Sequence, residues 1–426
     1  MQVINFIVDQ ILTEAAIFLG LIALVGMLLQ KKSFSDIISG VLKTVVGVLI
    51  LVAGVDVLIM AIVPLMEAFN YIHEAPEGAL VLTPMGVDAL LDQYGSQIGM
   101  AMLFAFLINL VVARFTPLKN IFLTGHMLFW FPVIFIAVAV EVGLTGTNMI
   151  VFATVFTAIY IILMPALIKP FVRQVIGDDS FTLGHPTAGL SIIAGFVAKY
   201  LGDKSKSTED INFPQSLDFL REITVTSSIV VFFVYLVMSL LVGPANASEV
   251  YGTGQNFIIF SLMNGALFGA GLTVLLQGVR MMLAEIIPAF KGISDKVIPN
   301  AVPALDCPII FPYAPNAVII GFIVSMISST ITLVLIGATG LVPFIILPLT
   351  ITCFFEIGTA SVIANGQGGL RGSIIGSAVA GVVMIVLVAV SIPFLSTTIA
   401  DWILIFGGND FSLWAVIAGA IGGIFG

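Results

Sequence analysis

Two histidines and one aspartate stand in apolar surroundings and could bind a polar ligand. His126 lies in NIFLTGHMLFWFP, His185 in FTLGHPTAGLSIIAGF and Asp306 in NAVPALDCPIIFPYAPNAVIIGF. An ionisable side chain inside an apolar segment costs several kcal/mol, so each is by default a candidate functional residue. Imidazole and carboxylate groups can bond hydroxyl groups, carry protons or bind metal ions.

The two histidines each follow a glycine. Before His126, Gly125 allows a backbone or a ligand to approach closely, although His126 could instead bond a carbonyl group at a helix end. After His185, the residues Pro186 and Thr187 interrupt regular structure, and the apolar stretch that follows is too short to span a membrane. This pattern predicts a re-entrant helix whose free N–H groups favour an anionic or hydroxyl-rich ligand. The alternative is a loop histidine near the membrane interface.

Asp306 is the strongest single candidate for a ligand-binding residue. Prolines at 299, 303, 308, 312 and 315 forbid a continuous helix around it. The residues between these prolines are apolar, and broken backbone in a membrane is tolerated only against protein or a water-filled cavity. The alternative role for Asp306 is a local helix cap.

Other ionisable residues in apolar segments are less informative. Glu356 precedes a glycine-rich run that predicts another broken helix end, and a structural role and a binding role are equally compatible with it. We interpret Arg280 and Glu285 as interhelical or interfacial groups, because five residues place them about 140° apart on a helix. Asp56 and Glu141 are interpreted as structural.

The elements that position these residues must be membrane helices. Of 426 residues, 59% are hydrophobic and only 9% are charged, against about 25% charged residues in soluble domains. Continuous apolar runs indicate helices rather than a barrel. We predict an all-α, polytopic bundle of about eleven spans plus broken or re-entrant helices. The spans are expected near 11–30, 39–64, 97–115, 127–142, 148–169, 224–243, 256–283, 317–338, 341–355, 372–393 and 410–426.

Three stretches, 71–96, 176–222 and 286–316, fit none of these spans well and hold most of the informative polar residues. Two features hint at an internal repeat: LTGH and LGH recur 59 residues apart, and two long apolar helices begin with a similar basic and Ile-Ile pattern. Such repeats with broken helices are typical of transporters. Basic residues gather in three loops: at Lys31, Lys32 and Lys43, at Lys169 and Arg173, and between Lys199 and Arg221. The positive-inside rule places these loops in the cytoplasm.

Several function classes lack support. The net charge of −9 gives no basic surface for nucleic acid. Cys307 and Cys353 form no CxxC pair, and the histidines form no local ligand pair, so we expect neither a metal nor another cofactor. ATP-driven transport and hydrolysis also lack support, because the sequence has no Walker A loop, GxSxG or HExxH motif.

The chain resembles the ascorbate-type enzyme IIC family of the bacterial phosphoenolpyruvate-dependent sugar phosphotransferase system. The signature is QGVRMMLAEIIPAFKGISDKVIPNAVPALDCPIIFPYAPNAVIIGF, residues 277–322, and the LTGH and LGH segments and residues 20–54 match as well. The resemblance implies two inverted repeats, a core domain that holds the sugar, a second domain that makes a homodimer, and substrate ligands at His126, His185 and Asp306. Two family glutamines are replaced here by Trp130 and Pro186, which bears on substrate choice because sites built on hydrogen bonds discriminate strongly.

We therefore expect a multi-pass permease of the bacterial cell membrane that takes up L-ascorbate or a related small polyhydroxylated substrate. Residues 1–426 are interpreted as one membrane-embedded domain without a soluble IIA or IIB domain. The phosphoryl group is expected from a cysteine of a separate phospho-IIB protein, itself supplied by IIA, and not from Cys307. The alternative is an ion-coupled carrier or facilitator in which Asp306 and Glu356 carry protons.

Overall fold

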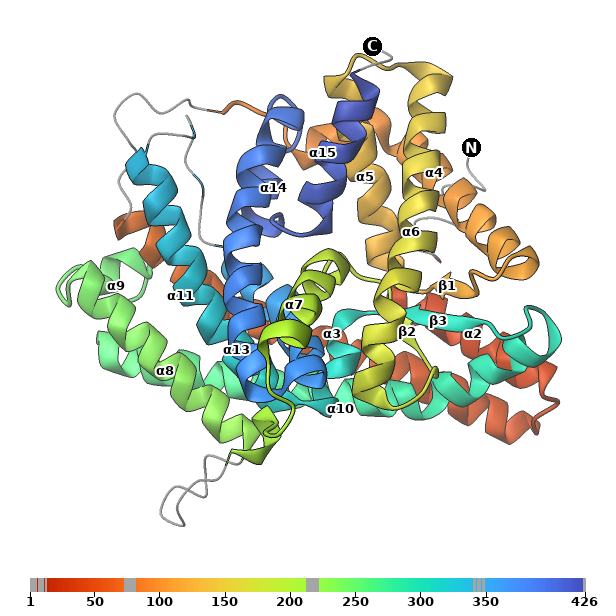
Figure 1. Cartoon of the computed structure of the whole chain (residues 1–426), viewed down its shortest axis with the longest axis horizontal. Coiled ribbons are helices and arrows are strands. Elements are labelled where there is room, and N and C mark those ends of the chain that lie inside the picture. Colours follow the sequence, from red (N-terminus) through yellow and green to blue (C-terminus); the bar gives the residue numbers. More distant parts are fainter. Residues whose placement is uncertain are drawn as a thin grey trace.

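The computed structural model describes residues 14–72, 82–211, 222–339 and 349–423, together with Phe6, Ile11, Val342 and Ile346. Helices dominate it, as predicted (Figure 1). The longer helices are α2 (Ala15–Leu29), α3 (Phe34–Ile72), α4 (Val87–Phe115), α5 (Gly125–Glu141), α6 (Gly146–Ile176), α7 (Ala188–Leu201), α8 (Ile223–Val242), α10 (Phe257–Lys296), α11 (Pro315–Thr339), α13 (Gly358–Ser391) and α15 (Asp410–Gly422).

Short elements connect these helices. The strands are β1 (Asn120–Phe122), β2 (Thr182–Leu183) and β3 (Val302–Leu305). The short helical turns are η2 (Thr208–Asp210), α9 (Ala247–Val250), η4 (Cys307–Tyr313), α12 (Thr350–Thr352), η5 (Cys353–Ile357), η6 (Ile392–Phe394) and α14 (Ala400–Phe406).

Length and apolar composition make this a membrane protein. Within the part of the chain that the structure describes, six stretches, in α3, α4, α6, α10, α11 and from Thr350 to Phe394, are long and apolar enough to cross a bilayer, and five shorter helices are also apolar. Exposed side chains on the outer helices are largely aliphatic, including Leu42, Leu49 and Met60 of α3. Such a surface is stable against lipid tails rather than water.

One group of helices consists of α2, α3, α8 and α10, which pack on one another and lie together at the bottom of Figure 1. Glycines allow the two longest, α3 and α10, to approach closely. A Cβ atom on Gly278 would lie 2.2 Å from the backbone nitrogen of Leu51, and one on Gly54 would lie 2.3 Å from that of Leu275. Small residues at such crossings are the usual basis of helix association in membranes.

A second group contains the remaining long helices. Helix α13 packs against α7, α11 and α15, while α4, α5 and α6 pack on one another and α15 packs on α5. Two helix groups are compatible with the core and dimerisation domains expected from the resemblance, but the assignment of those roles, the inverted repeat and the homodimer stay predictions.

The three short strands form a parallel sheet that the sequence did not predict. The order is β1-β3-β2, with Phe122 opposite Ala304 and Leu183 opposite Leu305. All the residues of β1, β2 and β3 are buried. Because the strands are parallel, their carboxyl ends meet at one edge of the sheet, which is where α/β proteins commonly place ligands.

The three stretches that fitted no span combine parts of helices with irregular chain where they are described. In 286–316, α10 ends at Lys296, and β3 and η4 follow before α11 begins at Pro315. In 176–222, the apolar piece after His185 is the fourteen-residue α7, whose first residue is buried. In 71–96, helix α4 begins about ten residues earlier than predicted, and residues 73–81 lie outside the described part of the chain.

Candidate functional site

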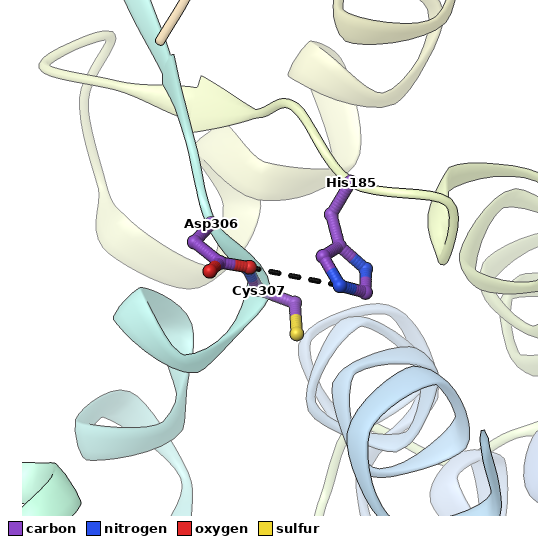
Figure 2. Close-up of side chains that lie close together, drawn as sticks. All are labelled: His185, Asp306 and Cys307. Atoms are coloured by element: carbon purple, nitrogen blue, oxygen red, sulfur yellow. Dashed lines mark hydrogen bonds and ion pairs between the residues drawn. The ribbon is translucent and has the colours of Figure 1, made fainter. Parts of the chain in front are cut away.

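His126, His185 and Asp306 come together although they are far apart in the sequence. His126 Nε2 lies 3.4 Å from Asp306 Oδ2, and His185 Nε2 lies 3.6 Å from Asp306 Oδ1. Figure 2 shows His185 and Asp306 pointing toward each other from separate segments. The carboxylate therefore lies between two imidazoles, with one oxygen facing each.

The sheet explains this convergence. Asp306 directly follows β3, His185 comes two residues after β2, and His126 comes four residues after β1. The backbone continues the pairing beyond the strands, since Leu123 N donates to Ala304 O and Gly184 N to Leu305 O, at 2.9 and 2.8 Å. Three parallel strands thus carry the three side chains to one edge of the sheet.

Asp306 also caps a helix. Its Oδ1 accepts a hydrogen bond from Cys307 N at 2.7 Å at the start of η4, and Pro308 follows at the beginning of that turn. An N-terminal cap of this kind fixes the side chain and is worth about 1 kcal/mol. The capping role and the binding role considered from the sequence are therefore both compatible with the structure, because Oδ2 remains directed toward His126.

These side chains line a cavity of about 450 Å³, within the usual range for sites that hold small molecules. Its polar lining is completed by Glu14, Cys307, Thr352 and Glu356. Most of the rest is apolar or aromatic: Leu51, Val52, Val55, Ile59, Met127, Trp130, Pro308, Ile351, Phe355, Trp402, Phe406 and Phe411. The cavity combines a few convergent polar groups with apolar walls, as expected of a site that orients one small ligand.

The three polar side chains differ in exposure. The side chain of His126 is 42% exposed, that of Asp306 22% and that of His185 only 5%. His126 is therefore the most accessible of the three, while His185 lies at the inner wall of the cavity.

A buried hydrogen-bond network fixes the position of His185. Its Nδ1 accepts from Thr187 N at 3.3 Å, which leaves the proton of a neutral ring on Nε2, facing Asp306. The Tyr160 hydroxyl lies 3.0 Å from the His185 carbonyl oxygen and 2.9 Å from Asp410 Oδ2. Asp410 Oδ1 in turn accepts from Gly189 N at 2.9 Å, so this carboxyl ties the start of α15 to the start of α7.

The other residues proposed from the sequence divide into two kinds. Trp130 lines the cavity and stacks on Trp402, with ring centroids 4.5 Å apart. Gly125 lines a small adjoining cavity of about 40 Å³ that also touches His126 and Asp306. Pro186 and Thr187 do not line the 450 Å³ cavity.

Pro186 and Thr187 instead hold the chain around His185. The Pro186 carbonyl accepts from Asp410 N at 2.9 Å. The Thr187 hydroxyl is buried and bonds the Glu356 carbonyl at 2.7 Å and the Ser191 hydroxyl at 2.9 Å. We therefore propose positioning roles for these two residues rather than contact with the ligand.

The structure also shows the contacts of two acidic residues that the sequence analysis interpreted as interhelical or structural. Glu285 of α10 pairs with Lys43 of α3 at 3.2 Å, which makes it the interhelical group that its spacing from Arg280 indicated. Glu141 Oε1 accepts from the backbone N–H groups of Thr397 and Thr398, at 2.7 and 3.1 Å, which fits a structural role.

Sequence reasoning missed Tyr160, Trp402, Asn409 and Asp410. The last two stand in LIFGGNDFSLW, where an amide and a carboxyl follow two glycines inside an apolar segment. That is the same kind of signal that identified Asp306. Tyr160 and Trp402 gave no such signal, because an aromatic residue in a membrane helix is ordinarily part of the packing.

Cys307 lies beside the histidine–aspartate cluster. Ligand atoms of His185, Asp306 and Cys307 all lie within 4.8 Å of one another (Figure 2). Nitrogen, oxygen and sulfur ligands suit zinc, but the same side chains line the 450 Å³ cavity, and Asp306 Oδ1 already accepts a bond from the backbone. The expectation that the chain binds no metal stays a prediction.

Two comparisons with known proteins both point to the same kind of permease. A model of the family described as "PTS system sugar-specific permease component" matches residues 10–410. A curated relative from Mycoplasma pneumoniae, named "Ascorbate-specific PTS system EIIC component", is 25% identical over 466 aligned residues. The alignment covers 97% of this chain and 70% of the relative.

Proposed function

Because this chain belongs to the family of sugar-specific permeases of the phosphotransferase system, we propose that it takes up L-ascorbate, or a closely related small polyhydroxylated compound, as a phosphate ester. Members of this family are multi-pass proteins of the bacterial cell membrane that transport a sugar together with IIA and IIB components. The proposal concerns the identity of the substrate, the residues that bind it and the homodimer.

The cavity beside the sheet is the observation that carries the proposal. Asp306, His126 and His185 present hydrogen-bonding atoms within a few ångströms of one another, which suits adjacent hydroxyl groups on one small molecule. A hydroxyl group can both donate and accept, so it can bond the carboxylate and an imidazole at once.

The aromatic wall favours a flat substrate. Trp130 and Trp402 stack and line the cavity together with Phe355 and Phe411. The lactone ring of L-ascorbate is planar, and a planar ring makes more contact with a tryptophan face than a puckered sugar ring does. The name of the Mycoplasma pneumoniae relative supports the same substrate.

In this proposal the chain positions the substrate and supplies no covalent nucleophile. A hydroxyl oxygen of the substrate attacks the phosphorus of the phosphocysteine on IIB, the sulfur–phosphorus bond breaks, and the substrate leaves as a phosphate ester. Rigid-body movement of the substrate-holding helices carries the cavity from the outer to the cytoplasmic side. A homodimer provides the fixed part against which those helices move.

Transport into vesicles tests this function. Purified protein is reconstituted, and labelled L-ascorbate is offered with phosphoenolpyruvate and the partner enzymes, or with a proton gradient alone. The proposal predicts a labelled phosphate ester only in the first condition, and none with the Asp306→Ala variant. Accumulation of unmodified L-ascorbate driven by the gradient would favour the ion-coupled carrier instead.

A further inference from the structure

Glu356 is an unexplained acid at the wall of the 450 Å³ cavity. It lies in η5, a five-residue π-helical turn between α12 and α13, and its side chain is almost wholly buried. Turns of this kind are rare within helices and frequently occur at functional sites.

One oxygen of the Glu356 carboxyl group is firmly held. Asn409 Nδ2 donates to Glu356 Oε1 at 2.8 Å and also lies 3.0 Å from Phe406 O. Asn409 Oδ1 accepts from Phe411 N at 3.0 Å, which fixes the orientation of the amide and identifies Nδ2 as the atom that faces Glu356. The carboxyl group is therefore locked in place from one side.

The other oxygen, Oε2, is buried and has no hydrogen-bond partner within the described structure. An unpaired buried polar atom costs about 1–3 kcal/mol. Because Glu356 lines the cavity, a ligand bound there can supply the missing partner. Both protonation states of the carboxyl group can bond a hydroxyl, since a hydroxyl donates to a carboxylate and accepts from a carboxylic acid.

Glu356 is also connected to the histidine side of the site. Its backbone carbonyl accepts from the Thr187 hydroxyl at 2.7 Å, and Thr187 N donates to His185 Nδ1. The turn that holds Glu356 and the segment that holds His185 are thus fixed relative to each other.

We infer that Glu356 is a fourth substrate-binding residue, whose Oε2 bonds a hydroxyl of the ligand and so selects polyhydroxylated compounds. The inference rests on the proposed function for the identity of that ligand. Asn409 serves as a positioning residue, because it reaches the ligand only through Glu356.

Affinity measurements with altered ligands test this role. Dissociation constants are measured on the purified full-length protein for L-ascorbate and for analogues that each lack one hydroxyl group, with pentoses, hexoses and polyols as further ligands. The variants are Glu356→Ala and Glu356→Gln. Gln367→Ala is the matched control, since Gln367 of α13 is also buried with an unpaired amide nitrogen but does not line the cavity.

We expect Glu356→Ala to weaken L-ascorbate binding about 5- to 140-fold, the equivalent of one buried hydrogen bond. Glu356→Gln should bind within a few-fold of the wild type, because its amide can donate to the same hydroxyl, and Gln367→Ala should bind normally. The loss caused by Glu356→Ala should disappear for the one analogue that lacks the bonded hydroxyl.

Two results would overturn the role of Glu356. One is an equal loss for every analogue, which indicates a structural effect; the other is unchanged affinity in Glu356→Ala. If the wild type binds a polyol instead of L-ascorbate, the substrate proposal is wrong and the same comparison on that polyol decides the role of Glu356. If the wild type binds no compound of the panel, both proposals are wrong.

Discussion

Replacement of Asp306 by alanine is the most informative single perturbation. The side chain is 22% exposed, so it is largely shielded from water, and its carboxylate oxygens lie 3.4 and 3.6 Å from the imidazoles of His126 and His185. A hydrogen bond from a substrate hydroxyl to such a carboxylate is worth about 1.5–3 kcal/mol. At 1.4 kcal/mol per factor of ten, each lost bond lowers affinity about 10- to 140-fold.

The same replacement has a smaller cost for folding. Asp306→Ala removes the cap on Cys307 N at the start of η4, at about 1 kcal/mol. Asp306→Asn serves as the matched control, because it keeps an oxygen for the cap and a neutral bond to the ligand. We therefore expect Asp306→Ala to insert and fold but to lose measurable uptake, and Asp306→Asn to retain part of it.

Two measurements separate the effect on binding from the effect on folding. One is the uptake of labelled L-ascorbate by cells that lack their own ascorbate uptake system, and the other is the melting temperature of each purified variant. His126→Ala and His185→Ala should reduce uptake less severely than Asp306→Ala. If Asp306→Ala transported normally while either histidine variant failed, the reasoning would be refuted. The broken segment 299–316 would then be a structural hinge.

Four further predictions concern other parts of the chain. Trp130→Gln should change the preference among ligands in a competition assay more than it changes the melting temperature, because the stacked ring forms cavity wall. Cys307→Ser should still support phosphorylation of the substrate by phospho-IIB; loss of all phosphoryl transfer with intact binding would assign the thiol a chemical role. Gly278→Leu should prevent folded protein from accumulating in the membrane, measured by detergent size-exclusion, because a side chain there meets the backbone of α3. The Arg173 guanidinium holds the pKa of the Asp179 carboxyl below its usual value. This pair therefore stabilises the fold above about pH 4, and the stabilisation is lost as the pH falls through the lowered pKa. Asp179→Asn should lower the free energy of unfolding by at most about 1 kcal/mol at pH 7, and melting temperatures of the two proteins should become equal at acid pH.

Composition and apolar runs were sufficient to predict a helical membrane bundle and the breaks around Asp306. They were sufficient because backbone groups within a bilayer must be satisfied internally, which leaves few architectures. The candidate site could be located for a related reason. Ionisable residues are costly at that depth, so His126, His185 and Asp306 were conspicuous in the sequence itself.

The sheet could not be predicted in the same way. Its strands have two to four residues, too few to show the alternation that identifies a strand. Their pairing joins segments as much as about 180 residues apart, so no local pattern encodes it. Without the sheet, the sequence could not show that the two histidines flank one carboxylate, nor that Pro186 and Thr187 lie behind the cavity rather than in its wall.

The network around Asp410 shows a further limit. Asp410 stands at the start of the last helix, and its partners Tyr160 and Gly189 belong to α6 and α7. Tyr160 and Gly189 are unremarkable in their own segments, and Asp410 is conspicuous only as a carboxyl group in an apolar segment. Only packing of the three helices makes them a unit that holds His185.

A structure of the purified protein with bound L-ascorbate tests the central claim most directly. The account predicts the ligand in the cavity beyond the carboxyl ends of β1, β2 and β3. Its hydroxyl groups should lie within hydrogen-bonding distance of Asp306 and at least one of His126 and His185, and its ring against Trp130 or Trp402. A ligand bound elsewhere, with the Asp306 carboxylate making no contact to it, would contradict the account.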